Sequence, residues 1–267
     1  MKNIIIHCGW DLKFDLYHDK QIELFVDQIP NTPIPEGVVR FVFLLEPPEI
    51  VNHSSHALYG LQTNTYDYLL THNQDLINAS DKAHLFEFGT TWIKDYAFPD
   101  KEFTISALVG GKLMADGHYL RQDVLGHRDS IVTPKNFYTS SHFPPRVGSL
   151  GLNILGDDKI PLFNSQFHIC IENTKRLNWF TEKLIDCMVT KTVPIYWGCP
   201  NIGDWFNLDG MLIVNNLEDI INVSNSLTEN TYNEKLDAIN ENYEIAKKLA
   251  TIDDRLINKI NQLLNEQ

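Results

Sequence analysis

The chain has few cysteines, and none of them is in a metal-binding or redox spacing. Its 267 residues contain Cys8, Cys170, Cys187 and Cys199, and no two of them form a C-x-x-C pair. This spacing excludes the common zinc and dithiol motifs. Cys170 and Cys187 lie in apolar runs, where a free cysteine behaves as a small hydrophobic residue. We therefore expect free thiols and a reducing compartment.

Long hydrophobic runs are also missing. A membrane-spanning helix needs about 18 consecutive apolar residues, and the sequence has no such run. Residues 1–10 hold too few apolar residues for the core of a signal peptide. From these two absences we expect a cytoplasmic protein without a transmembrane segment.

Positive charge is scarce. Lysine and arginine together number 22 against 35 aspartates and glutamates, so the formal net charge is −13. A surface this acidic repels nucleic-acid phosphates and anionic membranes, which argues against both as partners. A small nucleotide stays possible, because it needs only a local cluster of donors.

Two nucleotide and metal motifs are absent. The chain has no G-x-G-x-x-G, which argues against a Rossmann oxidoreductase. It has no Asp-x-Asp pair, the feature that metal-dependent sugar transferases usually carry, so we expect no essential metal. We interpret Asp157-Asp158 as a loop turn. His53 and His56 are the only histidines at ligand spacing, in a serine-rich stretch that we interpret as surface.

Short apolar runs alternate with polar helical stretches along the chain, which is typical of parallel sheets covered by helices on both faces. A proline among charges in residues 94–101 indicates a linker. We therefore predict two α/β domains, 1–97 and 98–267, the second with a helical tail. The predicted strands are 3–7, 38–45, 68–71, 84–88, 103–109, 130–132, 167–171 and 192–197, and the predicted helices are 56–66, 119–125, 179–190 and several beyond 217.

The most informative stretch lies around residues 167–200. Glu172 and Asn173 directly follow a predicted strand, at the sheet edge where ligands of parallel α/β folds bind. Thr181, Glu182 and Lys183 fall in the first turn of the next helix. A helix N-terminus offers free N–H groups and a positive dipole end, both suited to a diphosphate. Lys183 adds a full charge, and Glu182 can accept hydrogen bonds from ribose hydroxyls.

The same residues have plainer interpretations. On spacing alone, Glu182 and Lys183 fit an ordinary solvated first turn better than a ligand site, since acidic residues are favoured there. Glu172 can equally cap the helix. The spacing therefore leaves the role of these residues open.

Taken as a whole, the stretch F-H-I-C-I-E-N-T-K-R-L-N-W-F-T-E-K-L-I-D-C-M-V-T-K-T-V-P-I-Y-W-G-C-P, from Phe167 to Pro200, closely resembles the signature of glycosyltransferase family 10, the α-1,3/4-fucosyltransferases. The match is nearly gapless, and bacterial members look most similar. The segment from Phe103 to Arg121 resembles the family's strand and arginine element. In the first half, L-L-E-P-P-E around Glu46 resembles the family's E-S-P element.

The resemblance implies a GT-B fold with two Rossmann-like domains facing across a cleft. It implies inverting transfer of a sugar from a nucleotide-sugar donor, with GDP-fucose favoured, to a hydroxyl of a glycan acceptor. No cofactor or metal would be required. By position, Glu46 resembles the general base. The residues that resemble donor-binding positions are Arg121, with Lys112 as a substitute, Glu172, Asn173, Phe180, Thr181, Glu182 and Lys183.

The chain departs from the family pattern at two of these positions. Phe180 stands where the family usually has a tyrosine, and Pro47 stands where it has the serine of E-S-P. The predicted first domain is also short. These departures leave open another GDP-hexose or UDP-hexose as donor, and a non-catalytic glycan- or nucleotide-binding module of the same fold as an alternative function.

Overall fold

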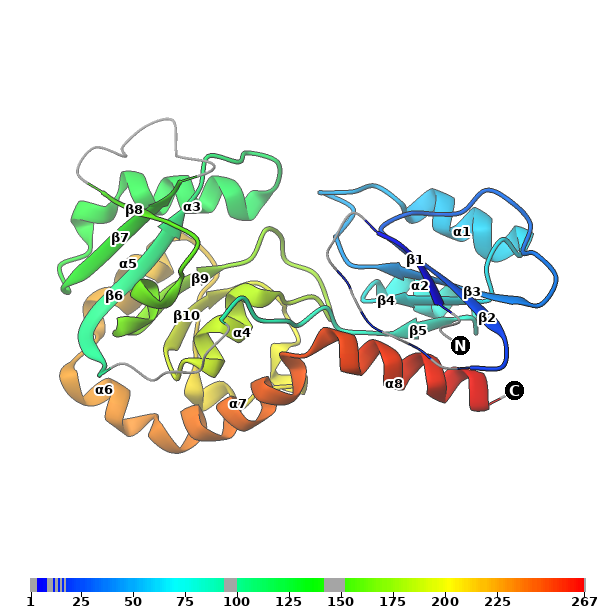
Figure 1. Cartoon of the computed structure of the whole chain (residues 1–267). Helices are drawn as coiled ribbons and strands as arrows, with labels where there is room; N and C mark the ends of the chain where they lie inside the picture. The colour runs from blue at the N-terminus through cyan, green and yellow to red at the C-terminus, as the bar shows by residue number, and fades with distance from the viewer. Residues whose placement is uncertain are drawn as a thin grey trace. The chain divides into compact units, whose positions relative to one another are not determined.

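Two compact units make up the chain in the computed structural model (Figure 1). The structure describes residues 4–8, 12, 14, 16, 18–93, 100–141 and 152–266. Unit 1 comprises residues 1–88, 176–179 and 251–267, and unit 2 comprises residues 89–175 and 180–250. Most of the predicted linker at 94–101 lies outside the described residues. The chain passes from unit 1 to unit 2 after Phe88, earlier than the predicted boundary at residue 97.

Unit 1 is built on a parallel five-stranded sheet in the order β1-β2-β3-β4-β5. Its central strand β3 has six consecutive buried residues, which is why it reads as an unbroken apolar run with no alternation. Helices α1 and α2 cover one face through Ala57, Leu61 and Leu76. The elements are β1 (Ile4–His7), β2 (Gln21–Val26), β3 (Val38–Leu44), α1 (Ser54–Thr63), β4 (Tyr68–Thr71), α2 (Gln74–Ala79) and β5 (Ala83–Leu85).

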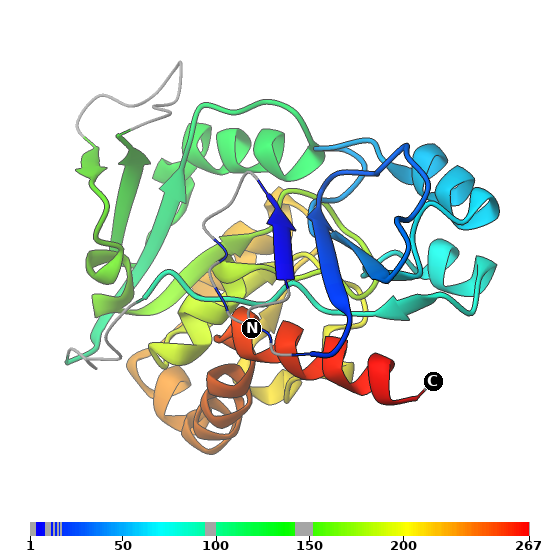
Figure 2. The same ribbon diagram turned by 45° about the vertical axis from the view of Figure 1, so that its right-hand side comes forward.

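The other face of this sheet is covered by the last helix of the chain, α8 (Ile252–Asn265), red in Figures 1 and 2. Leu256, Ile260 and Leu263 on α8 are buried against strand residues such as Phe41 and Leu70. The sequence interpretation placed this tail with the second domain. The structure places it in unit 1, because the sheet would otherwise expose its second apolar face.

Unit 2 is built on a parallel six-stranded sheet in the order β11-β10-β9-β6-β7-β8. Helix α4 packs on one face and α3, α5 and α6 on the other, while α7 contributes Ala246 to the first core and Ile239 to the second. The strands are β6 (Glu102–Val109), β7 (Lys135–Ser140), β8 (Asn153–Leu155), β9 (Ser165–Ile171), β10 (Val193–Trp197) and β11 (Leu212–Ile213). The helices are α3 (Asp116–Gly126), α4 (Glu182–Val189), α5 (Leu217–Ser226), α6 (Glu229–Glu234) and α7 (Leu236–Leu249), with short 3-10 turns η1 (Arg128–Ser130), η2 (Ile160–Asn164), η3 (Ile202–Asp204) and η4 (Leu208–Gly210).

The predicted strand at 130–132 is wrong. Residues 128–130 form the 3-10 turn η1, and the strand begins five residues later, as β7. Strand β7, K-N-F-Y-T-S, buries only Phe137 and Thr139. Its other residues are mostly polar, so the sequence shows no apolar run at this strand. Within the described parts of the chain, no helix is both long and apolar enough to span a lipid bilayer.

Candidate functional site

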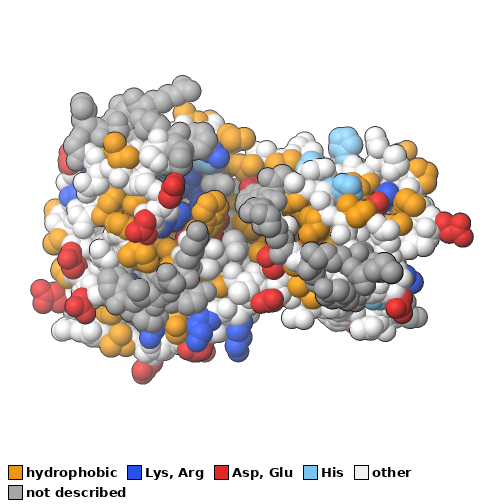
Figure 3. Space-filling model, viewed as in Figure 1, with side chains coloured by type: hydrophobic (Ala, Val, Ile, Leu, Met, Phe, Trp, Pro, Cys, Tyr) orange, Lys and Arg blue, Asp and Glu red, His pale blue; other side chains and the backbone are white. Residues whose placement is uncertain are grey.

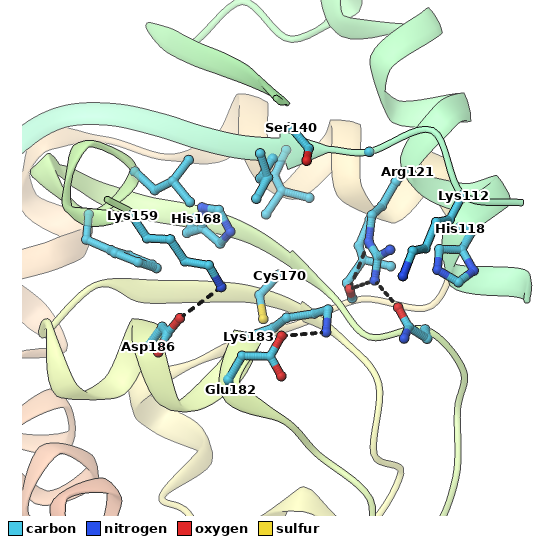
Figure 4. Close-up of a pocket in the computed structure, with 17 residues that line it drawn as sticks. Lys112, His118, Arg121, Ser140, Lys159, His168, Cys170, Glu182, Lys183 and Asp186 are labelled. Atoms are coloured by element: carbon cyan, nitrogen blue, oxygen red, sulfur yellow. Dashed lines mark hydrogen bonds and ion pairs between the residues drawn. The ribbon is translucent and has the colours of Figure 1, made fainter. Parts of the chain in front are cut away.

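A cavity of about 230 Å³ opens in unit 2, beside the ends of β6 and β9 and the first two turns of α4 (Figure 4). Its place agrees with the rule that ligands bind at the carboxyl ends of parallel strands. Strands β6 and β9 are neighbours at the centre of the sheet. The lining residues are Leu108, Gly110, Lys112, His118, Arg121, Ser140, Lys159, Leu162, Phe163, His168, Ile169, Cys170, Ile171, Asn173, Glu182, Lys183 and Asp186.

The N-terminus of α4 is held in place by Glu172, at the end of β9. One carboxylate oxygen accepts a hydrogen bond from Thr181 N and the other from Thr181 Oγ1, both at 2.8 Å. Thr181 is in turn the N-cap of α4 and accepts from Lys183 N at 3.3 Å. Glu172 is fully buried, and this burial raises the pKa of its carboxyl against the opposing effect of Lys183. Glu172 therefore fixes the first turn, as the capping interpretation expected.

Lys183 and Glu182 form an ion pair at the middle of the cavity, with Nζ 2.9 Å from Oε1. Burial lowers the pKa of Lys183, but Glu182 and Glu172 together outweigh it, so the pKa is raised. Burial alone would raise the pKa of Glu182, yet Lys183 and Lys159 hold it at about 2. Both side chains are therefore charged at neutral pH, and neither is an ordinary solvated first-turn residue.

Arg121 reaches the cavity from α3. Its Nε donates to Ile171 O at 3.1 Å, and one terminal nitrogen donates to Asn173 Oδ1 at 2.9 Å. The structure gives its other terminal nitrogen no partner among the described residues. Asn173 O accepts from Gly117 N at 2.9 Å, which ties α3 to the loop after β9. The guanidinium is thus fixed in orientation and keeps donors for an anion.

His118 lies beside Arg121 and is held as a neutral imidazole (Figure 4). Burial lowers its pKa to about 4, assisted by Arg121, Lys183 and Lys112. Its Nδ1 accepts from Ala115 N at 3.1 Å, so the proton of the neutral ring is assigned to Nε2. His118 can therefore donate a hydrogen bond into the cavity without adding charge.

A second charged pair occupies the other end of the cavity. Lys159 Nζ lies 3.5 Å from Asp186 Oδ2 and 4.7 Å from the centre of the Trp92 ring. Asp186 Oδ1 accepts from Thr91 Oγ1 at 2.7 Å and from Trp92 N at 2.9 Å. Burial raises the pKa of Asp186 to about 6, against the opposing charge of Lys159.

The floor of the cavity contains a neutral histidine. His168 accepts or donates at Nδ1 to Ser106 Oγ, 2.7 Å away. Burial, and to a smaller extent the charge of Lys159, lower the pKa of His168 to about 3. The floor therefore adds hydrogen-bonding capacity without charge.

Positive charge exceeds negative charge in the cavity wall. Four cationic side chains face two carboxylates there, although the whole chain is strongly acidic. Figure 3 shows lysine and arginine atoms gathered in a recess on the face of unit 2 that it presents. Such a local cluster at a helix N-terminus can hold a diphosphate and stabilise its departure as a leaving group.

Five of the eight residues expected to contact a donor line this cavity: Lys112, Arg121, Asn173, Glu182 and Lys183. The other three do not. Glu172 and Thr181 are buried and hold the N-terminus of α4. Phe180 is fully buried in the core, with its ring edge-on to Trp205 and Phe206 at 5.3 and 5.7 Å. Phe180 is not among the residues that line the cavity.

Sequence reasoning missed the residues at the second charged end. Asp186 lies four positions after Glu182 on α4, so the helical period places both on one face. That signal was present in the sequence. Lys159 precedes η2, in a stretch without periodicity, and only the path of the chain brings it to the cavity.

Glu46, the expected general base, lies in unit 1 beside a small hollow that it lines with His53 and His72. Its backbone N–H donates to Asp27 Oδ1 at 3.1 Å, as Leu45 N does at 2.8 Å. Asp27 has a left-handed backbone, with φ 49°, and fixes the turn that presents Glu46.

Several smaller expectations concern metal ligands. His53 is half-buried beside Glu46, whereas His56 is exposed. Asp158 accepts from Ile160 N at 2.9 Å in a local turn, in line with the loop interpretation. Among the described residues, no three His, Cys, Asp or Glu side chains come together to hold a metal ion.

Comparisons with known proteins agree with this geometry. No known family profile matches the chain. A stretch of 59 residues, 22% of the chain, is 39% identical to the α-(1,3)-fucosyltransferase FucT of Helicobacter pylori and spans 12% of the length of that relative. The chain therefore aligns with only a small part of that curated relative.

Solved structures match over most of the chain. A crystal structure of α1,3-fucosyltransferase with GDP-fucose superposes with a TM-score of 0.52 at 18% identity, covering 86% of this chain and 70% of the other. The pneumococcal O-GlcNAc transferase GtfA, in complex with UDP and GlcNAc, gives 0.53 at 12% identity, covering 91% and 56%. The two parallel α/β sheets and these neighbours show that the chain has a GT-B fold, as expected.

Proposed function

We propose that the chain is a glycosyltransferase that transfers a sugar from a nucleotide-sugar donor, with GDP-fucose favoured, to a hydroxyl of a glycan acceptor. The observation that supports this most is the cavity of unit 2, whose cationic wall lies at the N-terminus of α4. The GT-B fold and the local identity to a fucosyltransferase agree with it.

In the proposed donor complex, the diphosphate lies between Lys183 and Arg121. Lys183 is a compact point charge, whereas the fixed guanidinium of Arg121 can bind two phosphate oxygens together. His118 and Lys112 line the same end of the cavity, and Glu182 accepts from the ribose hydroxyls. These groups stabilise the negative charge that develops on the departing diphosphate.

For the reaction itself, we assign Glu46 as the general base. It takes the proton of the acceptor hydroxyl as the oxygen attacks the anomeric carbon. The carbon–oxygen bond to the diphosphate breaks as the new bond forms, so a single displacement inverts the configuration at that carbon. Asp27 holds the backbone of Glu46 through its N–H.

The donor site is tested by calorimetric binding of GDP, UDP, GDP-fucose and GDP-mannose to the wild type, to Lys183→Ala and to Lys247→Ala. Lys247 lies on the exposed side of α7, where it pairs with Glu244, and is the control for loss of one positive charge from unit 2. We expect GDP and its sugars to bind the wild type and Lys247→Ala alike, and Lys183→Ala to weaken binding at least tenfold.

Other outcomes point elsewhere. Selective binding of UDP would retain a nucleotide-sugar site but reject the fucosyl donor. A well-folded protein that binds none of these nucleotides would reject the transferase and favour the non-catalytic module.

A further inference from the structure

Charged side chains line the cavity at two ends, and the two ends differ. In Figure 4, Arg121, Lys112 and His118 lie at one end, Lys159 and Asp186 at the other, and Lys183 with Glu182 between them. The inference below rests on the proposed donor site, in which the phosphates occupy the Arg121 end. The ribose then lies near Glu182, and the nucleobase extends toward Lys159 and Asp186.

The spacing along α4 fits a nucleoside. Glu182 and Asp186 are separated by four residues on the same helix, so their Cβ atoms lie about 5–6 Å apart on one face. From one face of α4, the two carboxylates can therefore contact two different parts of one nucleoside. Leu162 and Phe163, both buried, add apolar surface to the cavity wall, as a flat base requires.

Asp186 still has acceptor capacity for a ligand. Its Oδ1 already accepts from Thr91 and Trp92. Its Oδ2 is 3.5 Å from Lys159 Nζ, longer than the 2.7–2.9 Å of a charge-assisted hydrogen bond. Among the described residues, no donor lies within this shorter distance of Oδ2. A buried carboxylate oxygen beside a lysine with protons to donate matches a partner that offers N–H groups next to a carbonyl.

We propose that Asp186 and Lys159 recognise the base edge of a guanine nucleotide, which makes Asp186 a specificity-determining residue. The edge of guanine presents O6, N1–H and the N2 amino group in order. Lys159 donates to O6, and Asp186 Oδ2 accepts from N1–H and N2–H. Uracil offers one N–H between two carbonyls, and its second carbonyl would face the carboxylate.

The Asp186→Asn variant tests this by changing the preferred base. The Oδ1 position faces two donors, Thr91 Oγ1–H and Trp92 N–H, so the amide oxygen takes that place and the NH₂ group faces the cavity. An NH₂ group opposes the amino group of guanine but pairs with the 2-carbonyl of xanthine. Thr91→Val, which removes a hydrogen bond from the same carboxylate outside the cavity, is the matched control.

Binding of the diphosphates of guanosine, inosine, xanthosine and uridine is measured by calorimetry at pH 7.5. We expect the wild type to bind guanosine diphosphate roughly tenfold more tightly than inosine diphosphate, which lacks the 2-amino group. Asp186→Asn should lose about tenfold for guanosine diphosphate and gain about as much for xanthosine diphosphate. Thr91→Val should keep the wild-type ranking.

Three results would overturn the assignment. If Asp186→Asn keeps the wild-type ranking, Asp186 has only a structural role. If the wild type binds the four diphosphates equally or prefers uridine diphosphate, the cavity is still a nucleotide site, but the assignment of Asp186 and Lys159 to guanine is wrong. If none of the four diphosphates binds, both this assignment and the proposed function are wrong. The comparison of guanosine with inosine diphosphate needs only the wild type, so equal binding of the two would overturn the base assignment even if the variant does not fold.

Discussion

Asp186 is a carboxylate whose ionisation in the folded chain is opposed by burial. Its pKa is raised to about 6 from an ordinary value near 3.8. The folded state therefore binds a proton more readily than the unfolded state between these two values. Its contribution to stability is complete below about pH 3.8 and is lost as the pH rises through 6. Such a group is poorly placed for stability, which agrees with a role in recognition.

This linkage makes a prediction about Asp186→Asn. The variant has no proton to lose at this position, so its melting temperature relative to the wild type should increase between pH 4.5 and pH 7.5. Thermal unfolding of both proteins across this range measures the difference between their melting temperatures. The effects of the other titrating groups largely cancel in this difference, because both proteins contain them. A difference that stays constant with pH, or that falls as the pH rises, would contradict the raised pKa.

A second residue-scale prediction concerns Glu46. Glu46→Gln keeps the shape of the side chain but removes the basic oxygen, so transfer should fall by about 10²–10⁴-fold while GDP binds as before. The measurement is release of GDP from GDP-fucose with a panel of glycan acceptors, together with calorimetry. Glu36→Gln, an exposed residue of the same unit, is the control. Equal loss of GDP binding and of turnover would show that Glu46 acts on structure and not as the base.

At the residue scale, the sequence motif identified the charged residues near the start of α4. It did not show which of them line the cavity and which hold the helix in place. Glu182 and Lys183 line the cavity, whereas Glu172 and Thr181 hydrogen-bond each other beneath it. The order of residues along a chain does not show which of two adjacent polar side chains makes its hydrogen bonds within the protein and which faces a cavity. That depends on where the first turn of α4 meets the end of β9.

At the scale of elements, α3 approaches the loop after β9 so closely that only glycine fits. A Cβ built on Gly117 would lie 1.8 Å from the backbone oxygen of Glu172. The contact is with backbone, which cannot rotate away as a side chain would. This approach lets Gly117 N bond Asn173 O and places Arg121, one turn further along α3, at the cavity.

Gly117→Ala should therefore push α3 away from β9. We expect a destabilisation of about 1–3 kcal/mol, typical of overpacking, together with weaker GDP binding because Arg121 is displaced. Gly126→Ala in the same helix meets no atom within 4 Å and should leave both properties unchanged or slightly improve stability. Thermal unfolding and calorimetry check the pair, and equal behaviour of the two variants would refute the steric explanation.

The elements that the sequence predicted well are the central strands, because burial on both faces makes them continuous apolar runs. Strands β3, β9 and β10 are found within two residues of their predicted bounds. Strand β2 was not predicted, since Glu23 interrupts its apolar run. In the structure Glu23 pairs with the buried Arg40 on β3, with 2.8 Å between the charged atoms. A pair of charges on adjacent strands cannot be recognised from either segment alone.

At the scale of the whole molecule, unit 1 depends on a helix that is distant in sequence. Ile260 on α8 is fully buried against the first sheet. Ile260→Ala should destabilise unit 1 by about 2–5 kcal/mol and leave GDP binding unchanged, since the cavity residues all belong to unit 2. Asn258→Ala, at an exposed position of the same helix, should do neither. A loss of GDP affinity in Ile260→Ala would show that the two units do not behave independently.

The division of the chain between the units also sets the order in which they can be completed during synthesis. The ribosome makes residues 89–250 before residues 251–266, so unit 2 has all its segments while the first sheet still lacks the helix for one face. The strands of the first sheet are thus made before unit 2 but reach their final packing after it. Until α8 emerges, the apolar face of the first sheet that it covers is exposed and prone to aggregation.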